Sequence, residues 1–240
     1  MKYPNKVQAF YAYRNKLIIT LVLVIFILIS TNSVFSQNIT GHRIIPDLNQ
    51  SKLDRIREVG KYDIDKYPVE KYFIDNNLIN PIKAGEMLSY EILNLELVMI
   101  NNTGEQRSFK IKDIDSAKTI VLDIWAIGCK PCILSMDKWN CLVDSLNKEV
   151  AFFGLYLGYN HYLVPYKNEK NWKVNSIFGL NAYVLTRSFL KAPLAGHLIW
   201  IKGGKLIAIT NPSDSNLKTI KNHLDSNLVN LKSLNNEWTY

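Results

Sequence analysis

An apolar strand that runs directly into two cysteines is the feature that most constrains this chain. Residues 119–125 are apolar at nearly every position and rich in β-branched side chains, which predicts a strand covered on both faces. A short turn follows, and residues 131–147 have approximately the apolar spacing of an α-helix. Cys129 and Cys132 stand at this junction. The sequence therefore predicts two sulfur atoms at the beginning of a helix that leaves a buried strand.

The position of the two cysteines predicts redox chemistry. The first backbone N–H groups of a helix have no internal partner, and their partial positive charge stabilises a thiolate at Cys129. Lys130 adds a cation beside the same sulfur, and Pro131 suits the first turn, where its missing N–H costs nothing. Cys132 lies one turn further in, close enough for a disulfide and less exposed. We expect a dithiol/disulfide pair in which Cys129 attacks and Cys132 resolves.

Two other roles for the cysteines remain open. Zinc would need two further ligands at compatible spacing. Cys141 is nine residues on in the same predicted helix, where a buried position is expected, and His161 and His197 are isolated. A purely structural disulfide is the other alternative. The expectation is a redox pair with neither a bound metal nor another cofactor.

The motif resembles the thioredoxin superfamily, and within it the exported TlpA/ResA-like thiol–disulfide oxidoreductases of bacterial envelopes. The likeness covers roughly residues 81–228 and rests on Trp125-Ala126, the Cys-Lys-Pro-Cys tetrad from Cys129 to Cys132, and Asp123 six residues before the first cysteine. It implies that Asp123 is a buried acid that helps to move a proton off Cys132. It also implies a reductase that acts on protein disulfides and takes electrons from a membrane-embedded thiol donor.

Several residues depart from the family pattern. Gly128 stands where many relatives have a second Trp, and Asp137 stands where many have a helix-kinking proline. The family's cis-proline, which faces the cysteines and borders the substrate groove, corresponds here to Gly196 or Ala195, with Pro193 slightly upstream. A cis bond before a residue other than proline costs about 2.5–4 kcal/mol. Unless Pro193 takes the role, we expect trans bonds and a reshaped loop.

These departures leave two functions to compare. The first is a cell-envelope thiol–disulfide oxidoreductase, which the family resemblance predicts to act as a reductase rather than as an oxidant. The second is a thioredoxin-like binding or scaffold module with little or no redox activity, which the altered loop and Gly128 favour. A peroxidase would need a Thr-x-x-Cys motif, which the residues around Cys129 do not supply.

The remaining patterns predict an α/β fold, with a mixed sheet sandwiched by helices. Strand patterns cover 95–100 and 107–111 on either side of a loop with Gly104, and 150–157 is expected to lie parallel to the central strand. Residues 158–179 read as irregular and aromatic, with a core face favoured for the aromatic side chains. Residues 181–185 read as a short strand, and 197–202 with 205–210 read as a hairpin across two glycines. A helix is expected from Pro212 onwards.

The N-terminal region predicts export. Four basic residues within positions 2–16 precede the apolar run 17–29, and small residues at 34 and 36 fit a cleavage site, as in a secretory signal. The alternative is an uncleaved anchor. Thirteen residues at about 1.5 Å each span about 20 Å, short of the ~30 Å hydrocarbon core, whereas 17–35 would span it through polar residues. The product is thus expected in the periplasm or cell envelope, either soluble or tethered to the inner membrane by residues 17–35.

The predicted organisation has three parts: a signal or anchor over 1–36, a polar extension over 37–80, and a thioredoxin-like domain over 81–240. In the extension, residues 51–60 read as a short helix with Ser51 as its N-cap, and Tyr62, Tyr67 and Tyr72 are expected to anchor the extension on the domain. The net charge of +8 is scattered, without a basic block interleaved with aromatic residues, so nucleic acid is not expected as a partner.

Overall fold

The computed structural model describes residues 41–44, 49–60, 63–74, 80–192, 194–214 and 220. Its helices are α2 (Gln50–Gly60), α3 (Tyr90–Asn94), α4 (Lys130–Leu146), α5 (Asn160–Lys170) and α6 (Leu180–Phe189). Its strands are β1 (Gly41–Ile44), β2 (Lys71–Ile74), β3 (Leu97–Ile100), β4 (Gln106–Phe109), β5 (Thr119–Trp125), β6 (Val150–Tyr156), β7 (Ser176–Phe178), β8 (His197–Lys202) and β9 (Lys205–Thr210). Short 3-10 helices occupy Ile111–Asp113 and Pro212–Asp214.

Seven of the described strands form one mixed sheet in the order β4-β3-β7-β6-β5-β8-β9. β5, β6 and β7 are parallel, whereas β3, β4, β8 and β9 join through antiparallel pairs. The central strand β5 is buried along its whole length, as the predicted apolar run over 119–125 requires. The β8–β9 hairpin has the predicted bounds, and Gly203 and Gly204 turn it with positive φ angles.

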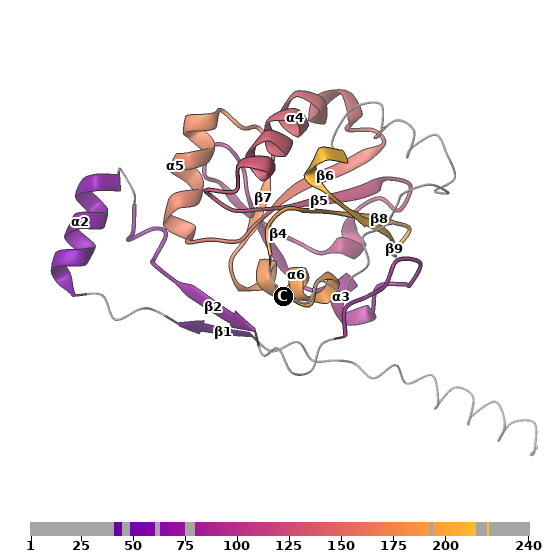
Figure 1. The fold of residues 1–240 in the computed structure, drawn as a ribbon, viewed down its shortest axis with the longest axis horizontal. Helices are drawn as coiled ribbons and strands as arrows, with labels where there is room; N and C mark the ends of the chain where they lie inside the picture. Colours follow the sequence, from indigo (N-terminus) through magenta and orange to yellow (C-terminus); the bar gives the residue numbers. More distant parts are fainter. Residues whose placement is uncertain are drawn as a thin grey trace, which may run out of the picture. The chain divides into compact units, whose positions relative to one another are not determined.

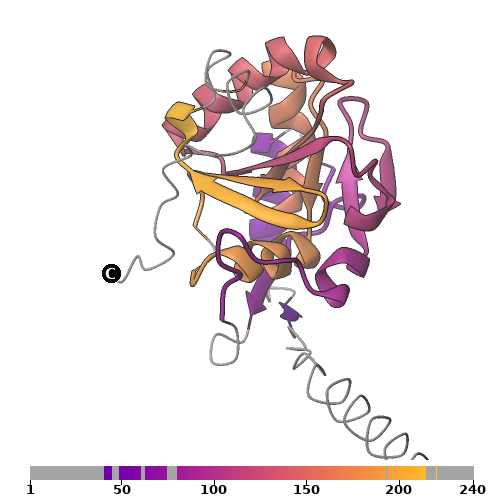
Figure 2. The same cartoon turned by 90° about the vertical axis from the view of Figure 1, so that its right-hand side faces the viewer.

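Helices cover both faces of this sheet (Figure 1). Alternate residues of β5 point to opposite faces. Val121 and Trp125 pack in one buried cluster with Cys132 and Met136 of α4, whereas Leu122 packs in a second cluster with residues of α3 and α6. The β8–β9 hairpin faces the viewer in Figure 2, with α4 on one side and α6 on the other. The arrangement confirms the predicted α/β sandwich.

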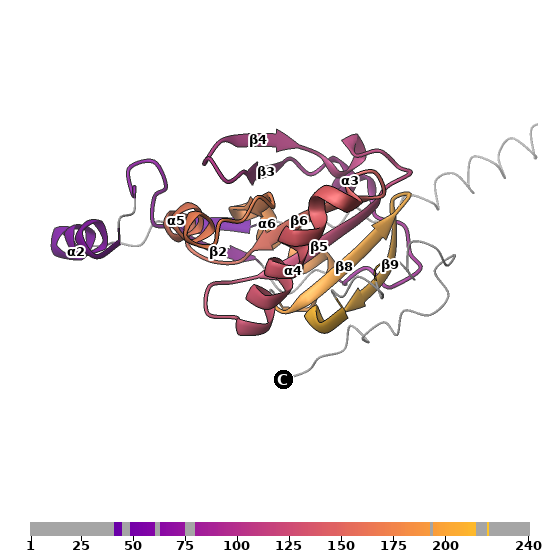
Figure 3. The ribbon, with the colours of Figure 1, turned by 90° about the horizontal axis from the view of Figure 1, so that it is seen from above.

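The strand connections define a thioredoxin-like fold. A parallel β5–α4–β6 unit lies at the centre, and the antiparallel β8–β9 hairpin extends the sheet beyond β5. Seen from above, α4 lies over the central strands (Figure 3). This order places the N-terminus of α4, and therefore the two cysteines, at the end of β5.

Two sequence predictions within the domain were wrong. Residues 181–185, predicted as a strand, lie in α6, a helix that is buried at almost every position from Ala182 onwards and so shows little amphipathic periodicity. Residues 158–179, predicted as irregular, contain α5 and β7. Pro165 lies inside α5 and obscured the helical pattern, since proline is disfavoured in helix interiors. The predicted core face of this segment is confirmed by Trp172, which is buried against Trp125.

The polar extension docks on the domain through its tyrosines. The Tyr67 hydroxyl donates to Gly104 O at 3.2 Å in a buried position. The Tyr72 hydroxyl bonds to Glu70 and accepts from Asn160 Nδ2 at 2.7 Å. β1 and β2 pair as a separate antiparallel two-stranded sheet. Both tyrosines anchor the extension, as the sequence indicates, and Tyr62 lies outside the described residues.

The N-cap of helix α2 differs from the one that the sequence predicts. Helix α2 begins at Gln50, and Asn49 Oδ1 rather than the predicted Ser51 accepts the Lys52 N–H, because Asn49 lies one residue before the helix. The predicted signal or anchor over 1–36, and most of the predicted C-terminal helix, lie outside the described residues, although Ile220 is buried. None of the helices in the described part of the chain is long and apolar enough to cross a membrane.

Candidate functional site

Cys129 and Cys132 form a disulfide at the N-terminus of α4. Their Cα atoms are 5.3 Å apart, and Cys129 occupies the N-cap position of the helix. Its N–H donates to Ala126 O, and its carbonyl accepts the Ile133 N–H. Cys129 is half-buried, whereas Cys132 is completely buried. Cys129 is therefore the sulfur that an incoming partner can reach.

The surface next to the disulfide is apolar and basic. Lys130 and Pro131 are exposed in the first turn of α4, and the side chains of Ile127 and Leu134 are 41% and 53% exposed. Gly128 has a φ of +94°, a conformation that side chains rarely adopt. A tryptophan at this position would strain the backbone although the space there is open. Gly128 is thus tied to the shape of the turn that precedes Cys129.

Asp123 lies on β5 and is completely buried. It points to the same face of the sheet as Val121 and Trp125, which pack with Cys132. Burial raises the pKa of the Asp123 carboxyl to about 7, and the nearby Ser135 hydroxyl lowers it part of the way. Neither carboxyl oxygen has a hydrogen bond of ordinary geometry among the described residues. The acid can therefore exchange a proton near neutral pH on the side of the sheet that faces α4.

Trp125 lies in the interior of the domain, beneath the turn that leads to Cys129, and is not exposed at the surface. Its ring is completely buried and packs against Tyr156 at 4.7 Å and edge-on against Trp172 at 5.2 Å between ring centroids. This aromatic cluster supports the end of β5, from which the turn to Cys129 begins.

The loop before β8 lies beside the end of β5. Gly196 N–H donates to Ile124 O at 2.8 Å, and Ala195 packs against the buried cluster that includes Cys132. No peptide bond between described residues is cis, so the bonds Leu194–Ala195 and Ala195–Gly196 are trans. Gly196 has a φ of +98°, which proline cannot adopt. Pro193 lies outside the described residues.

Asp137, noted in the sequence as a departure from the family pattern, has a structural contact. Trp172 Nε1 donates to Asp137 Oδ1 at 2.7 Å, which ties α4 to the segment between α5 and β7. Cys141, expected to be buried, is exposed and free of disulfides, because its position on α4 points away from the sheet. It therefore does not belong to the core of the domain.

The sequence analysis did not single out three buried residues of the domain. Ser135 lies one turn beyond Cys132, Gly154 lies opposite Asp123 on β6, and the completely buried Lys167 donates from Nζ to Ile100 O at 2.8 Å. Burial lowers the pKa of Lys167 to about 7. The sequence did not indicate that Lys167 is buried, because a lysine in a polar, aromatic stretch is normally exposed.

The histidines weighed as zinc ligands are not grouped with the cysteines. Burial lowers the pKa of His161 and of His197, and for His197 a backbone hydrogen bond with Leu194 opposes that effect. Across the described ranges, no group of three or more His, Cys, Asp or Glu side chains could hold a metal ion.

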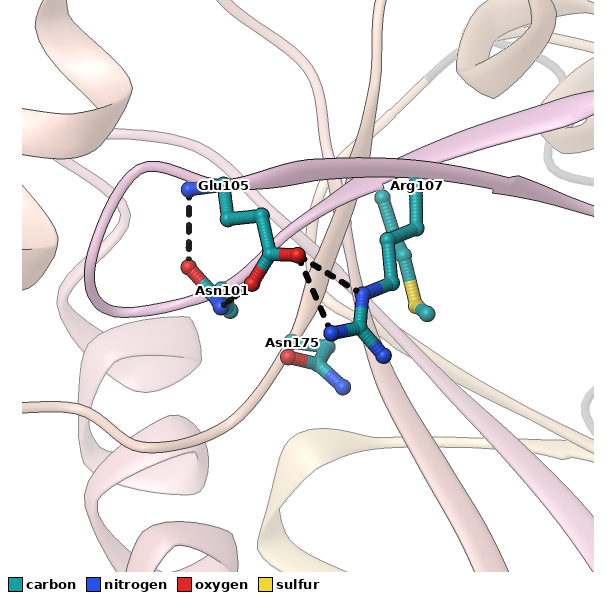
Figure 4. Close-up of a pocket in the computed structure, with 5 residues that line it drawn as sticks. Asn101, Glu105, Arg107 and Asn175 are labelled. Atoms are coloured by element: carbon teal, nitrogen blue, oxygen red, sulfur yellow. Dashed lines mark hydrogen bonds and ion pairs between the residues drawn. The ribbon is translucent and has the colours of Figure 1, made fainter.

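A small polar pocket lies away from the disulfide, on the β3–β4 hairpin and the start of β7 (Figure 4). Its volume is about 160 Å³, and it is lined by Met99, Asn101, Glu105, Arg107 and Asn175. The Arg107 guanidinium pairs with Glu105 at 3.0 Å. Since the two charges neutralise each other and no cysteine or histidine is present, the pocket has no evident part in the chemistry of the disulfide.

Comparisons with known proteins found no matching protein-family model and no matching curated protein. Among solved structures, peroxiredoxin Q of Xylella fastidiosa is similar at 10% identity and a TM-score of 0.47, over 59% of this chain and 93% of its own. A thiol:disulfide interchange protein from Bacteroides sp. is similar at 15% identity and a TM-score of 0.46, over 61% and 93%. The thioredoxin domain of a thiol–disulfide oxidoreductase from Bacteroides vulgatus is similar at 16% identity and a TM-score of 0.42, over 60% and 99%.

The fold is assigned from the strand order and connections rather than from these similarities. On that thioredoxin-like fold, the chain has a Cys129–Cys132 disulfide at the N-terminus of α4 and a buried acid, Asp123, on the sheet face that α4 covers.

Proposed function

We propose that this chain is a TlpA/ResA-like thiol–disulfide oxidoreductase of the cell envelope, acting as a reductase of protein disulfides. The observation that carries the proposal is the pairing of a reachable Cys129 with a buried Cys132 at one helix N-terminus, over a buried acid that titrates near pH 7. A purely structural disulfide needs neither the helix N-terminus nor the acid.

The proposed reaction starts from the reduced dithiol. The Cys129 thiolate attacks a substrate disulfide, one substrate sulfur leaves as a thiolate, and a mixed disulfide forms. Asp123 then accepts the proton of the Cys132 thiol, and the Cys132 thiolate attacks the Cys129 sulfur. The Cys129–Cys132 bond forms, and the second substrate sulfur leaves. Two electrons pass to the substrate, so a thiol donor, proposed to be embedded in the membrane, must reduce the enzyme again.

Trapping of the mixed disulfide tests this assignment. Cys132→Ser should accumulate covalent complexes with substrate proteins, seen as high-mass bands that a reductant removes. Cys129→Ser should trap none and should lose insulin-reducing activity. Cys141→Ser, which changes an exposed cysteine outside the disulfide, is the matched control and should behave as the unmodified protein. Accumulation of complexes by Cys129→Ser instead would contradict the roles given to the two sulfurs.

The direction of electron flow requires a separate measurement. A reduction potential near that of thioredoxin, about −270 mV, would support a reductase, and one near that of DsbA, about −120 mV, would indicate an oxidant.

The second candidate function is a thioredoxin-like binding or scaffold module. The specific observation in its favour is the loop before β8, where Gly196 has a positive φ and its N–H is already bonded to Ile124 O. Absence of both trapping by Cys132→Ser and insulin reduction would favour this module over the oxidoreductase.

We also propose the envelope location, from the sequence of residues 1–36. Cell fractionation and the mass of the mature protein test it. A soluble product starting near residue 37 supports a cleaved signal, a full-length membrane-bound product supports an anchor, and a soluble cytoplasmic product that keeps Met1 contradicts export.

A further inference from the structure

Asp123 belongs to a row of residues that crosses the sheet. It lies opposite Leu198 on β8 and Gly154 on β6, and Gly154 in turn lies opposite Ser176 on β7. Residues in direct register point to the same face of a sheet. The face covered by α4 (Figure 3) therefore holds a carboxyl group and a hydroxyl group, with a residue without a side chain between them.

Polar atoms gather where Gly154 leaves room. A Cβ atom at Gly154 would lie 2.7 Å from Trp125 Nε1 and 3.1 Å from Ser176 Oγ. These two atoms, both Asp123 oxygens and Ser135 Oγ are buried, and none has a hydrogen bond of ordinary geometry within the described ranges. Buried polar groups are nearly always hydrogen-bonded in native proteins. Unpartnered polar atoms on Asp123 and on the helix that covers its face leave room for a new hydrogen bond when a charge appears there.

Ser135 links this site to the resolving cysteine. It is only 1% exposed and lies three residues after Cys132, so both side chains lie on the same face of α4. Asp123 lies on the sheet face whose buried cluster includes Cys132 and Met136 of α4, and its register partners on the adjacent strands are Gly154 and Leu198. None of these carries a fixed charge. The buried Ser135 hydroxyl of α4 can thus donate a hydrogen bond to Asp123 when the carboxyl becomes charged.

We propose that Ser135 is a positioning residue for the proton transfer: when Asp123 is ionised, the buried Ser135 hydroxyl, which has no other hydrogen-bond partner among the described residues, turns to donate to the carboxylate and holds it ready for the Cys132 proton. This inference rests on the proposed oxidoreductase function and adds a residue to it. When the Cys132 S–H bond breaks and an O–H bond forms at Asp123, the carboxyl loses its charge and the Ser135 bond weakens. A hydrogen bond to the charged form lowers the pKa of a carboxyl, so the hydroxyl keeps Asp123 ionised at a lower pH than burial alone would allow.

The test titrates Asp123 directly in the folded protein, by NMR of ¹³C-labelled aspartate carboxyl groups. Ser135→Ala should raise the pKa of Asp123 by about half a pH unit or more. The pH profile of mixed-disulfide resolution should move upward by the same amount. Ser135→Thr retains a hydroxyl and should restore both values. The matched control is Ser188→Ala, which removes another buried serine hydroxyl, one that donates to Val184 O in α6 on the other face of the sheet.

A failure of the Ser135 inference can be distinguished from a failure of the proposed oxidoreductase function. The carboxyl titration needs no substrate, so it tests Ser135 even if the chain reduces nothing. An unchanged or lowered pKa in Ser135→Ala would overturn the inference. If Ser135→Ala is too unstable to titrate, Ser135→Thr decides: a wild-type pKa supports the inference, and a pKa raised with the hydroxyl still present overturns it.

Discussion

At Asp123, burial in the sheet couples chemistry to stability. The unfolded chain exposes this carboxyl to water, where its pKa is about 3.8, whereas burial raises it to about 7 in the folded protein. The folded state therefore binds more protons than the unfolded state between these two values. The free energy of unfolding falls as the pH rises through this window, because the ionised carboxyl is poorly solvated inside the fold.

Asp123→Asn should accordingly stabilise the protein at pH 8, by roughly 4 kcal/mol at most, and should have little effect below pH 4. Urea unfolding of both oxidised proteins across this range measures the difference. Glu149→Gln, at an exposed position, is the control and should leave the pH dependence unchanged. An equal pH dependence in Asp123→Asn and the unmodified protein would show that burial of this acid has no energetic cost. The same variant should slow the resolution of mixed disulfides.

At the scale of elements, α4 is attached to the segment that follows α5 by contacts of different strength. The completely buried Trp172 ring donates to Asp137, which is half-buried. Lys173 also forms an ion pair with Asp144 at 3.1 Å, but both side chains are more than 60% exposed. Exposed ion pairs contribute little, whereas a buried donor left without an acceptor is costly.

Asp137→Ala should therefore lower the free energy of unfolding by about 1–3 kcal/mol, because the Trp172 indole N–H loses its acceptor. Asp144→Ala is the matched control on the same helix and should cost less than about 1 kcal/mol. Chemical denaturation of the two variants gives both values. Equal losses would mean that the Trp172 bond does not hold α4 in place.

At the scale of the whole described chain, the polar extension is part of the folded unit. Tyr67 is buried in the same cluster as Trp125 and reaches Gly104 in the β3–β4 loop. Glu70 and Tyr72 meet Asn160 at the beginning of α5. The extension thus contacts two elements that lie far from it in the sequence, so its removal should expose surface that the domain normally buries.

Tyr67→Ala should destabilise the protein by about 3 kcal/mol, since it removes a buried ring together with its hydrogen bond. Tyr67→Phe keeps the ring and should cost only about 1 kcal/mol. Thermal unfolding measures stability, and limited proteolysis within residues 49–74 reports release of the extension. Wild-type stability in Tyr67→Ala would mean that the extension is not held through this residue.

The residues that could be interpreted from sequence alone were those whose local pattern has one physical solution. The β-branched run 119–125 can bury both faces only as a central strand, and two glycines between apolar runs make a tight hairpin. The residues that could not be interpreted from sequence alone were those whose surroundings are formed by distant segments. The apolar residues of α6 fit a strand or a buried helix equally well, and Cys141 gave no sign of which helix face it would occupy.

The sequence by itself therefore determined the residues of the candidate redox site: two cysteines at a helix N-terminus after a buried strand, with an acid six residues earlier. Only the tertiary structure decided the pKa of that acid. The register of β5 with β6 and β8 places Asp123 between Gly154 and Leu198, and α4 then supplies Ser135 from the helix above. The pKa of a buried group depends on everything packed around it, and those neighbours come together only when the sheet forms.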